Sequence, residues 1–273
     1  MKKYLLLLLS IVVFCNFTKE KKETQVKSTD EFPIMAWIGV PESETTVERF
    51  RELKESGINI NFSSYSSIEA VEKALDVAQE AGVKLMPSFP ELRSEPEKSA
   101  KRLMKHPALA GYHLTDEPGA ASFPELGKWV KRIQSVDKHH GCYINLFPNY
   151  APSEVLIGKD GVLAPGEDPY AKHVDMFLKE VPVPFISFDF YPVVEENGVR
   201  MLRTRWYQNL EIVADASRKS GRPFWAFALA IAHKPYPIPT VATLLMEHRP
   251  CNISLTGIPV MTHPGISMTP PLN

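Results

Sequence analysis

Short apolar runs alternate with amphipathic segments along most of this sequence, starting near residue 32. The apolar runs have the length of β-strands, and the segments between them carry apolar residues at the spacing of a helix. Strands that alternate with helices form parallel sheets, and a chain of 273 residues is near the usual size of one closed (β/α)8 unit. We therefore predict an α/β fold of the TIM-barrel type. Strands are expected at residues 32–40, 58–62, 83–89, 108–117, 142–147, 185–191 and 223–230, and helices at 45–56, 67–81, 96–105, 123–139, 169–180 and 200–220.

The eighth unit of this barrel is irregular in sequence. A helix can begin near residue 239, but Arg249 and Pro250 break it early, and residues 257–263 make a poor strand that ends at Pro264. We therefore expect the barrel to be incomplete at its C-terminal end, with residues 245–273 atypical. Two explanations stay open: a natural irregular closing segment, or a tail read out of frame from a longer ancestral gene. The nucleotide sequence of the gene distinguishes them.

The N-terminus has the pattern of a targeting signal. Lys2 and Lys3 precede an apolar stretch, residues 5–14, which suits a secretory signal but is short for a membrane span. Cys15 follows directly, and a Lys/Glu/Thr-rich tether continues to residue 31. This arrangement resembles a bacterial lipoprotein signal, in which Cys15 becomes the lipidated first residue. The bulky pair before Cys15 departs from the usual small residues, so plain secretion stays open. We expect a signal at 1–15, a tether at 16–31 and a barrel domain at 32–273.

Composition excludes several classes of function. The formal net charge is −1 with both signs mixed through the expected helices, so nothing favours a nucleic-acid partner. Phosphate-binding loops, dinucleotide fingerprints, serine-hydrolase elbows and zinc-protease motifs are absent from the sequence. Cys142 and Cys251 lack the spacing of a zinc site, and Cys142 is expected to be a buried thiol. We predict neither a cofactor nor a metal. The oligomeric state stays open.

Two expected strands end in carboxylates. The run 108–118 stops at Asp116, Glu117 and Pro118, and the run 184–192 stops at Asp189, Tyr191 and Pro192. Because the carboxyl ends of barrel strands form one face, where barrel enzymes keep their active sites, these acids are expected to meet in a cleft with aromatic side chains. A sugar suits such a cleft best. A structural alternative stays open, in which the acids only cap a helix or hold a loop.

At Trp37-Ile-Gly39, Gly111–Pro118 and Phe188–Pro192 the chain resembles (β/α)8 glycoside hydrolases. The resemblance is strongest to family 42 β-galactosidase-like enzymes and related glycosidases exported by Bacteroidetes, and it covers about residues 32–243. It implies a glutamate general acid at the end of the fourth strand, which Glu117 matches, and Asp116 beside it would raise its pKa by charge repulsion.

The same resemblance implies a glutamate nucleophile at the end of the seventh strand, where this chain has no carboxylate. Asp189, at the end of the sixth strand, is the best available partner for Glu117. The separation of the two carboxyl groups would decide between retention and inversion of configuration.

Several other residues are candidates for contacts with a sugar. Aromatic side chains at strand ends stack on sugar rings, although a place in the core is more common for any single aromatic residue. His113 is expected to share a side of its strand with Thr115, so it would contact the substrate or steady Glu117. The predicted substrate-binding residues are Trp37, His113, Asp116, Asn145, Tyr191 and His233, and Asn149 is a further candidate.

The leading hypothesis is an exported glycoside hydrolase of the cell envelope, lipid-anchored at the outer membrane or in the periplasm. Its partner would be an oligo- or polysaccharide, and its only link to a membrane would be the N-terminal anchor. The alternative is a catalytically inactive carbohydrate-binding lipoprotein on a degenerate barrel. A third possibility is a truncated product that does not fold stably. The sugar, the linkage, exo or endo action and the stereochemical course are not determined by the sequence.

Overall fold

The computed structural model describes residues 32–233, 235–241, 243 and 258–261. Within these residues, eight strands lie parallel to their neighbours, and six long helices lie between or beside them in the chain. The parallel strands are β1 Ile34–Trp37, β2 Ile60–Ser64, β3 Lys84–Ser88, β4 Gly111–Asp116, β5 Gly141–Leu146, β6 Ile186–Phe188, β9 Phe224–Ala226 and β10 Ile258–Met261. The long helices are α1 Val47–Glu55, α2 Ile68–Ala81, α4 Pro96–Leu103, α5 Phe123–Gln134, α7 Pro169–Glu180 and α8 Arg205–Ser220.

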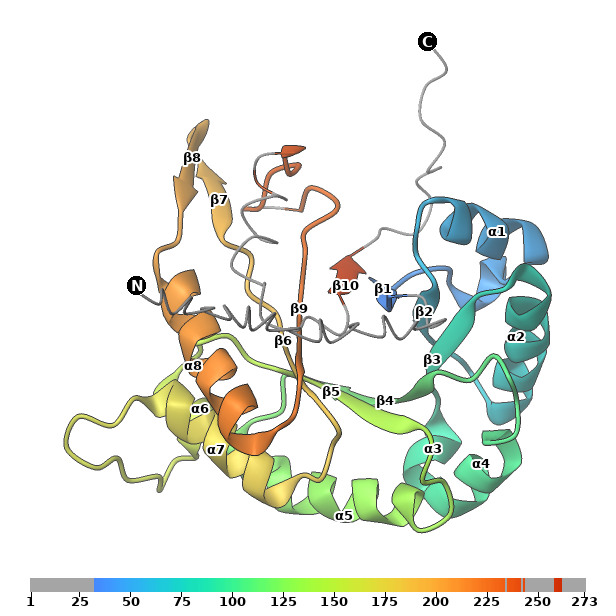
Figure 1. Ribbon diagram of the computed structural model, residues 1–273, viewed down its shortest axis with the longest axis horizontal. Coiled ribbons are helices and arrows are strands. Elements are labelled where there is room, and N and C mark those ends of the chain that lie inside the picture. The colour runs from blue at the N-terminus through green and yellow to red at the C-terminus, as the bar shows by residue number, and fades with distance from the viewer. Residues whose placement is uncertain (1–31, 234, 242, 244–257, 262–273) are drawn as a thin grey trace, which may run out of the picture. The chain divides into compact units, whose positions relative to one another are not determined.

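The parallel strands form two four-stranded sheets that together make the barrel. Their orders are β10-β1-β2-β3 and β4-β5-β6-β9. A parallel bridge between Leu85 and Leu109 joins the sheets at β3 and β4, and β9 contacts β10 at the other junction. Each strand therefore neighbours the next one in the ring, and the helices surround the strands from α1 to α8 (Figure 1). The fold is the predicted (β/α)8 TIM barrel.

Local signals explain where the helices begin and end. Ser67 accepts a hydrogen bond from the backbone N–H of Ala70 and so caps α2, and Gly82 ends this helix in a left-handed conformation with φ of 72°. At α7, Asp168 accepts hydrogen bonds from two backbone N–H groups. Short helical turns also occur in the loops: α3 Pro90–Ser94, α6 Ser153–Ile157, η1 Glu42–Glu44 and η2 Ala120–Ser122.

The core has two parts because successive strand residues point to opposite faces. The larger part packs the outer face of the barrel against the helices and includes Cys142, which is buried as expected. The smaller part, which we call the interior cluster, fills the barrel and is mostly aromatic. The interior cluster consists of Met35, Trp37, Ile60, Phe62, Met86, Tyr143, Tyr191, Trp225, Phe227 and Leu229.

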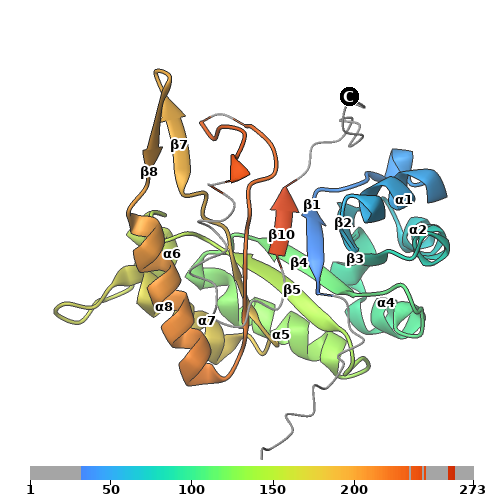
Figure 2. The same cartoon turned by 45° about the horizontal axis from the view of Figure 1, so that its top comes forward.

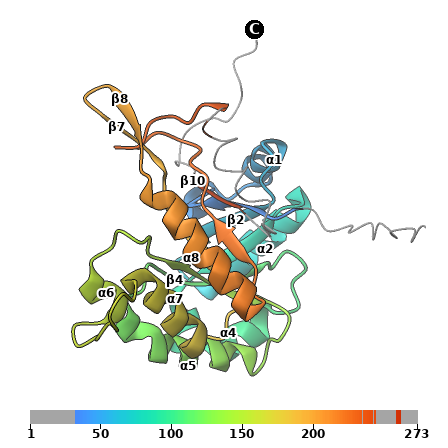
Figure 3. The same cartoon turned by 60° about the vertical axis from the view of Figure 1, so that its left-hand side comes forward.

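The prediction of one helix over residues 200–220 was wrong for its first turn. Instead, β7 Val193–Glu196 and β8 Val199–Leu202 form an antiparallel hairpin, and α8 begins at Arg205. Asn197 and Gly198 both have positive φ, which is the two-residue turn that an Asn-Gly pair favours. This pair was a hairpin signal that the helix assignment overlooked. The hairpin projects beyond α8 (Figures 2 and 3).

The eighth strand is present at the place where the sequence offered only a poor one. Strand β10 pairs in parallel with β1, from Ile34 with Ile258 to Trp37 with Met261. Residues 1–31, with Cys15, and most of 244–273 lie outside the described residues. Of the helix expected from residue 239, only residues 239–241 and 243 are described, and residues 241 and 243 are helical. Within the described part of the chain, helices long and apolar enough to cross a membrane are absent.

Candidate active site

Polar side chains cross three neighbouring strands at their carboxyl ends. In the sheet register, Asp116 of β4 lies beside Asn145 of β5, and Asn145 lies beside Ser187 of β6. The amide Nδ2 of Asn145 donates to Oδ1 of Asp116 at 3.0 Å, and Oγ of Ser187 donates to Oδ1 of Asn145 at 3.1 Å. The hydroxyl groups of Tyr143 and Ser187 are 2.7 Å apart. Asn145 and Ser187 are buried, so this network holds the floor of the site rigid.

A bulge in β4 directs Asp116 into this row. The register with β5 shifts between His113 and Thr115, which leaves Leu114 as the extra residue. Strict alternation would place Asp116 on the opposite face from His113. With the bulge, Asp116 comes level with inward-facing Asn145. The prediction that His113 and Thr115 share a side was therefore wrong, because a bulge reverses the alternation within one strand.

Glu117 follows the strand in an unusual backbone conformation. Its φ is 44°, in the left-handed region that residues with a Cβ seldom adopt, and Pro118 comes next. Its backbone N–H donates to the carbonyl oxygen of Asn145 at 2.9 Å, so pairing with β5 continues past Asp116. Such conformations cost about 1–3 kcal/mol and concentrate at functional sites. This backbone conformation orients the half-buried side chain of Glu117 toward Asp189 and the adjacent cavity.

The carboxyl groups of Glu117 and Asp189 are close enough to share a hydrogen bond. Asp189 directly follows β6, so the two acids come from strands that are two apart in the ring. Burial is the main cause that raises the pKa of both groups, and the charge of Asp116 adds to it in each. The contact between the two acids raises the pKa of Asp189 further and lowers that of Glu117. The pKa of Asp189 rises well above its ordinary range, so the more deeply buried Asp189 holds the proton of the pair in the free protein. The predicted contribution of Asp116 to a raised pKa of Glu117 is present, after burial. The role of Glu117 as general acid stays a prediction.

A cavity of about 560 Å³ opens beside Glu117, toward α3 and α5. Glu117 and Asp116 line it, and Trp129 and Arg93 lie on its wall. The guanidinium carbon of Arg93 is 5.4 Å from the centre of the Trp129 ring. Glu117 therefore contacts Asp189 and also borders a space that admits a ligand.

His113 is a core residue rather than a group that faces this cavity. Its ring stacks on Phe62 with centroids 4.0 Å apart and faces Tyr143 on the other side. It is 5% exposed, and neither ring nitrogen has a hydrogen-bond partner in the described part of the chain. Burial lowers the pKa of His113 to about 3, so the ring is neutral. Its predicted contact with a sugar is not supported by this position.

Trp37 and Tyr191 both belong to the interior cluster. Trp37 is 5% exposed, and its ring contacts Phe62 and Phe227 with centroids 4.7 and 5.0 Å apart. It therefore has no open face for stacking on a sugar. Tyr191 lies closer to the carboxyl pair: the charge of Asp189 contributes to the raised pKa of Tyr191, after burial. The Tyr191 hydroxyl is buried without a partner among the described residues.

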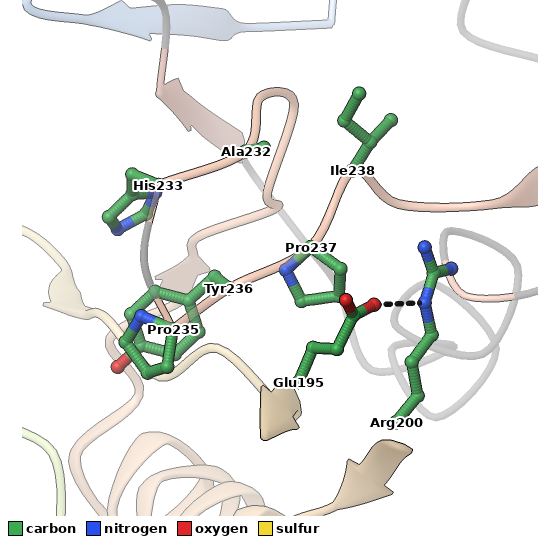
Figure 4. A pocket seen from close by; sticks show the side chains of 8 residues that line it. All are labelled: Glu195, Arg200, Ala232, His233, Pro235, Tyr236, Pro237 and Ile238. Carbon is green, nitrogen blue, oxygen red and sulfur yellow. Dashed lines mark hydrogen bonds and ion pairs between the residues drawn. The ribbon is translucent and has the colours of Figure 1, made fainter. Parts of the chain in front are cut away.

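His233 lies in the loop after β9, at the edge of the site. Its ring meets that of Tyr191 edge-on, with centroids 5.4 Å apart, and its backbone pairs with Tyr236. His233 and Tyr236 line a second cavity of about 550 Å³, which the hairpin borders with the ion pair of Glu195 and Arg200 (Figure 4). The predicted binding role of His233 stays a prediction.

Asn149 has a structural role in the described residues. Its Nδ2 donates to the carbonyl oxygen of Arg205, and its backbone N–H donates to Oδ1 of Asn209. The side chain is buried at the start of α8. The expectation that Asn149 binds sugar hydroxyl groups therefore lacks support, whereas Asn145 does lie within the polar row.

Sequence reasoning missed a cluster beside Asp189 that Tyr150, Arg203 and Tyr236 form. The guanidinium carbon of Arg203 is 3.9 Å from the centre of the Tyr150 ring and 4.9 Å from that of Phe190. Its Nη1 donates to the hydroxyl of Tyr236 at 3.4 Å. Tyr150 follows the end of β5 by four residues, so its position after a strand could have marked it as a site residue. Arg203 lies in the segment that was wrongly expected to be helical, and no sequence pattern marks it.

The fold and the paired carboxyl groups at the ends of β4 and β6 define the class: a (β/α)8 barrel with acids at the face where barrel enzymes work. Among the described residues, no group of three or more His, Cys, Asp or Glu side chains is placed to hold a metal ion.

Comparison with known proteins gives the fold neighbours of this barrel. Neither a family model nor a curated protein sequence matches the chain. An endo-β-1,4-glucanase variant of Xanthomonas axonopodis pv. citri has a TM-score of 0.55 at 11% identity, over 88% of this chain and 90% of that one. A β-mannanase of the blue mussel Mytilus edulis has a TM-score of 0.55 at 8% identity, over 85% and 87%. A hyperthermophilic endo-β-1,4-glucanase has a TM-score of 0.53 at 14% identity, over 85% and 89%. These fold neighbours are glycoside hydrolases, and at such identities the likeness concerns the fold.

Proposed function

We propose that this protein hydrolyses glycosidic bonds, with Glu117 and Asp189 as its two catalytic carboxyl groups. The observation that carries the proposal is the contact of these two acids at the carboxyl ends of β4 and β6, beside a cavity. Glycosidases work with two carboxyl groups that hold one proton between them. Burial and repulsion disfavour two charges in this pair, which supports that proton count.

The chemistry follows from where the proton lies. In the free protein Asp189 holds it. As positive charge develops on the sugar ring next to Asp189, the ionised form of Asp189 becomes favourable, and the proton passes along the shared hydrogen bond to Glu117. Glu117 then protonates the departing oxygen while Asp189 attacks the anomeric carbon and forms a glycosyl ester. Glu117 next removes a proton from a water molecule, which attacks the same carbon and releases Asp189.

The contact between the carboxyl groups favours retention over inversion. An inverting glycosidase keeps its carboxyl groups about 6.5–9.5 Å apart so that a water molecule fits between them. A retaining glycosidase keeps its carboxyl groups about 5–5.5 Å apart, and a pair in contact is nearer to this separation than to that of an inverting enzyme. We therefore propose a covalent intermediate on Asp189. The resemblance to family 42 enzymes would place the nucleophile after β9, where residues 227–231 contain no carboxylate. Asp189 takes its place in this proposal.

We also propose that the enzyme is exported and lipid-anchored through Cys15, at the outer membrane or in the periplasm, and acts on an oligo- or polysaccharide. The support is the charged, apolar and Cys-containing N-terminus followed by a polar tether. The fold neighbours act on polysaccharides such as β-1,4-glucan, which agrees with a carbohydrate substrate.

The test is hydrolysis of a panel of aryl glycosides and oligosaccharides by the wild type and three variants. Glu117→Gln is expected to lower kcat/KM about 10³-fold on oligosaccharides, and less on nitrophenyl glycosides, whose leaving group needs no proton. Asp189→Asn is expected to abolish turnover of both kinds of substrate. Glu80→Gln, in an exposed carboxylate of α2 outside the lining of this cavity, is the control and should retain activity. Equal activity of Glu117→Gln and the wild type on all substrates would refute the proposal.

The second candidate function is binding of carbohydrate without catalysis. The specific observation in its favour is the missing carboxylate after β9. In that case the wild type binds glycans and turns none of them over, and Glu117→Gln changes nothing but affinity.

A further inference from the structure

We propose that Arg203, with Tyr150 and Tyr236, forms a subsite for an acidic group of the glycan, a carboxylate or a sulfate. These three residues are called the Arg203 subsite below. This inference rests on the proposed function, since it names the substrate class of the same site: an anionic oligosaccharide.

The guanidinium group of Arg203 is held in place on several sides. Its carbon lies 3.9 Å from the centre of the Tyr150 ring and 4.9 Å from the centre of the Phe190 ring. Nη1 donates to the Tyr236 hydroxyl at 3.4 Å. The backbone N–H of Arg203 donates to the carbonyl oxygen of Pro192 at 2.7 Å, which ties the residue to the loop after β6. Stacking fixes the plane of the guanidinium. Because Nη1 is engaged by Tyr236, an anion would be bound through the other edge, Nε and Nη2, with two parallel hydrogen bonds.

The charge of Arg203 is not matched by the protein in the described part of the chain. No carboxylate there lies within ion-pair distance of it, whereas Arg49, Arg102, Arg132 and Arg200 each have at least one. Arg203 is half-buried, and its remaining N–H groups are not among the buried polar atoms that lack a partner. A partly desolvated cation whose donors reach solvent is a suitable partner for an anionic ligand.

The Arg203 subsite lies next to the carboxyl pair. The ring of Tyr236, whose hydroxyl accepts a hydrogen bond from Arg203, is 4.9 Å from that of Tyr191, two residues after Asp189 on the same side of the chain. The charge of Asp189 also contributes, after burial, to the raised pKa of Tyr150. Asp116, Glu117 and Asp189 would repel an acidic sugar, so an enzyme for such a sugar needs a cation close to them. Arg203 meets this need, and a neutral glycan would give it no partner.

The test is calorimetric binding in the Glu117→Gln background, in which turnover does not interfere. The probes are oligogalacturonides and oligoglucuronides, the same oligosaccharides after reduction of their carboxyl groups, and sulfated galactan oligosaccharides. Acidic probes are expected to bind at least 10-fold more tightly than their reduced forms. Arg203→Ala should abolish this difference and Arg203→Lys should keep part of it. Arg51→Ala, which removes an exposed cation on α1, should change nothing. Uronate and sulfate probes identify which anion the subsite takes.

Several results would overturn the inference. One is equal affinity of the unmodified site for acidic and reduced oligosaccharides, which needs no Arg203 variant and so holds even if Arg203→Ala fails to fold. A second is unchanged affinity of a folded Arg203→Ala protein for acidic probes, with folding checked by thermal unfolding. A third is binding of none of the probes. Tight binding of acidic probes that the wild type does not hydrolyse would instead refute the proposed function alone.

Discussion

At the scale of single residues, the carboxyl group of Asp189 is in the least water-like surroundings of the acids in the site. Burial raises its pKa first, and the charges of Glu117 and Asp116 raise it further. Its Oδ1 has no hydrogen-bond partner in the described part of the chain. The hydrogen bonds of Asn145 and Ser187 hold the neighbouring strands in place. Asp189 therefore stays in a buried position from which water is largely excluded.

This environment predicts the pH dependence of stability. Because the pKa of Asp189 is higher in the folded state than its ordinary value of about 4, the folded protein binds more protons, and stability falls as the pH rises above about 4 through the raised pKa. Asp189→Asn removes the ionisation, so this variant should be more stable than the wild type at pH 8. Each kcal/mol of relieved cost raises Tm by about 2–4 °C in a chain of this size.

Thermal unfolding of both proteins at pH 4.5 and pH 8.0 checks this expectation. The advantage of Asp189→Asn should be largest at pH 8.0 and small at pH 4.5, where the wild-type carboxyl is protonated in the folded state. An equal difference in Tm at both pH values would contradict the raised pKa.

At the scale of elements, close packing between helices limits the sequence in ways that helix propensity does not. Gly127 lies on the buried face of α5, and a Cβ at this position would collide with the backbone carbonyl oxygen of Glu180 at the end of α7. Glycine is therefore needed for the close approach of α7, although it is a poor helix former. The bulge in β4 is a second place where tertiary structure overrides local regularity. It interrupts the regular pairing with β5 and turns Asp116 toward the barrel interior.

The packing predicts a reversal of the usual effect of a glycine replacement. Gly127→Ala should gain about 1 kcal/mol in helix propensity, but the collision with a backbone atom should cost more. We expect a net loss of about 1–3 kcal/mol in the free energy of unfolding. Urea unfolding measures it. Lys131→Ala, at an exposed site of α5, is the control and should be near neutral. A Gly127→Ala protein as stable as the wild type would show that α5 and α7 lie farther apart.

At the scale of the whole molecule, β10 completes the ring of strands by pairing with β1, so the fold depends on a strand that lies late in the chain. The N-terminal segment determines the cellular location in our proposal. Its polar tether would let the barrel reach substrates at a distance from a membrane.

The proposed anchoring can be tested in a bacterium that processes lipoproteins. The wild type should incorporate labelled palmitate and sediment with membranes, and Cys15→Ser should remain unlabelled and unanchored. Cys251→Ser removes a different cysteine and should behave as the wild type does. Release of the wild type in unlabelled, soluble form would favour plain secretion.

The amino-acid sequence by itself determined the order of strands and helices and the two strands that carry the acids. Hydrophobic periodicity and capping residues are local properties, so segments such as 68–81 and 169–180 were predicted nearly to the residue. The hairpin at residues 193–202 was missed because a helical pattern downstream was extended over an Asn-Gly turn.

Only the tertiary structure decided which of these residues meet. The bulge at Leu114 separated His113 from Thr115, the barrel interior enclosed Trp37, and Arg203 came to lie on Tyr150 from a distant segment. The contact of Glu117 with Asp189 and the place of their proton also depend on burial by other strands. Burial, pKa and contact are properties of neighbours that are far apart along the chain, and local sequence patterns do not contain them.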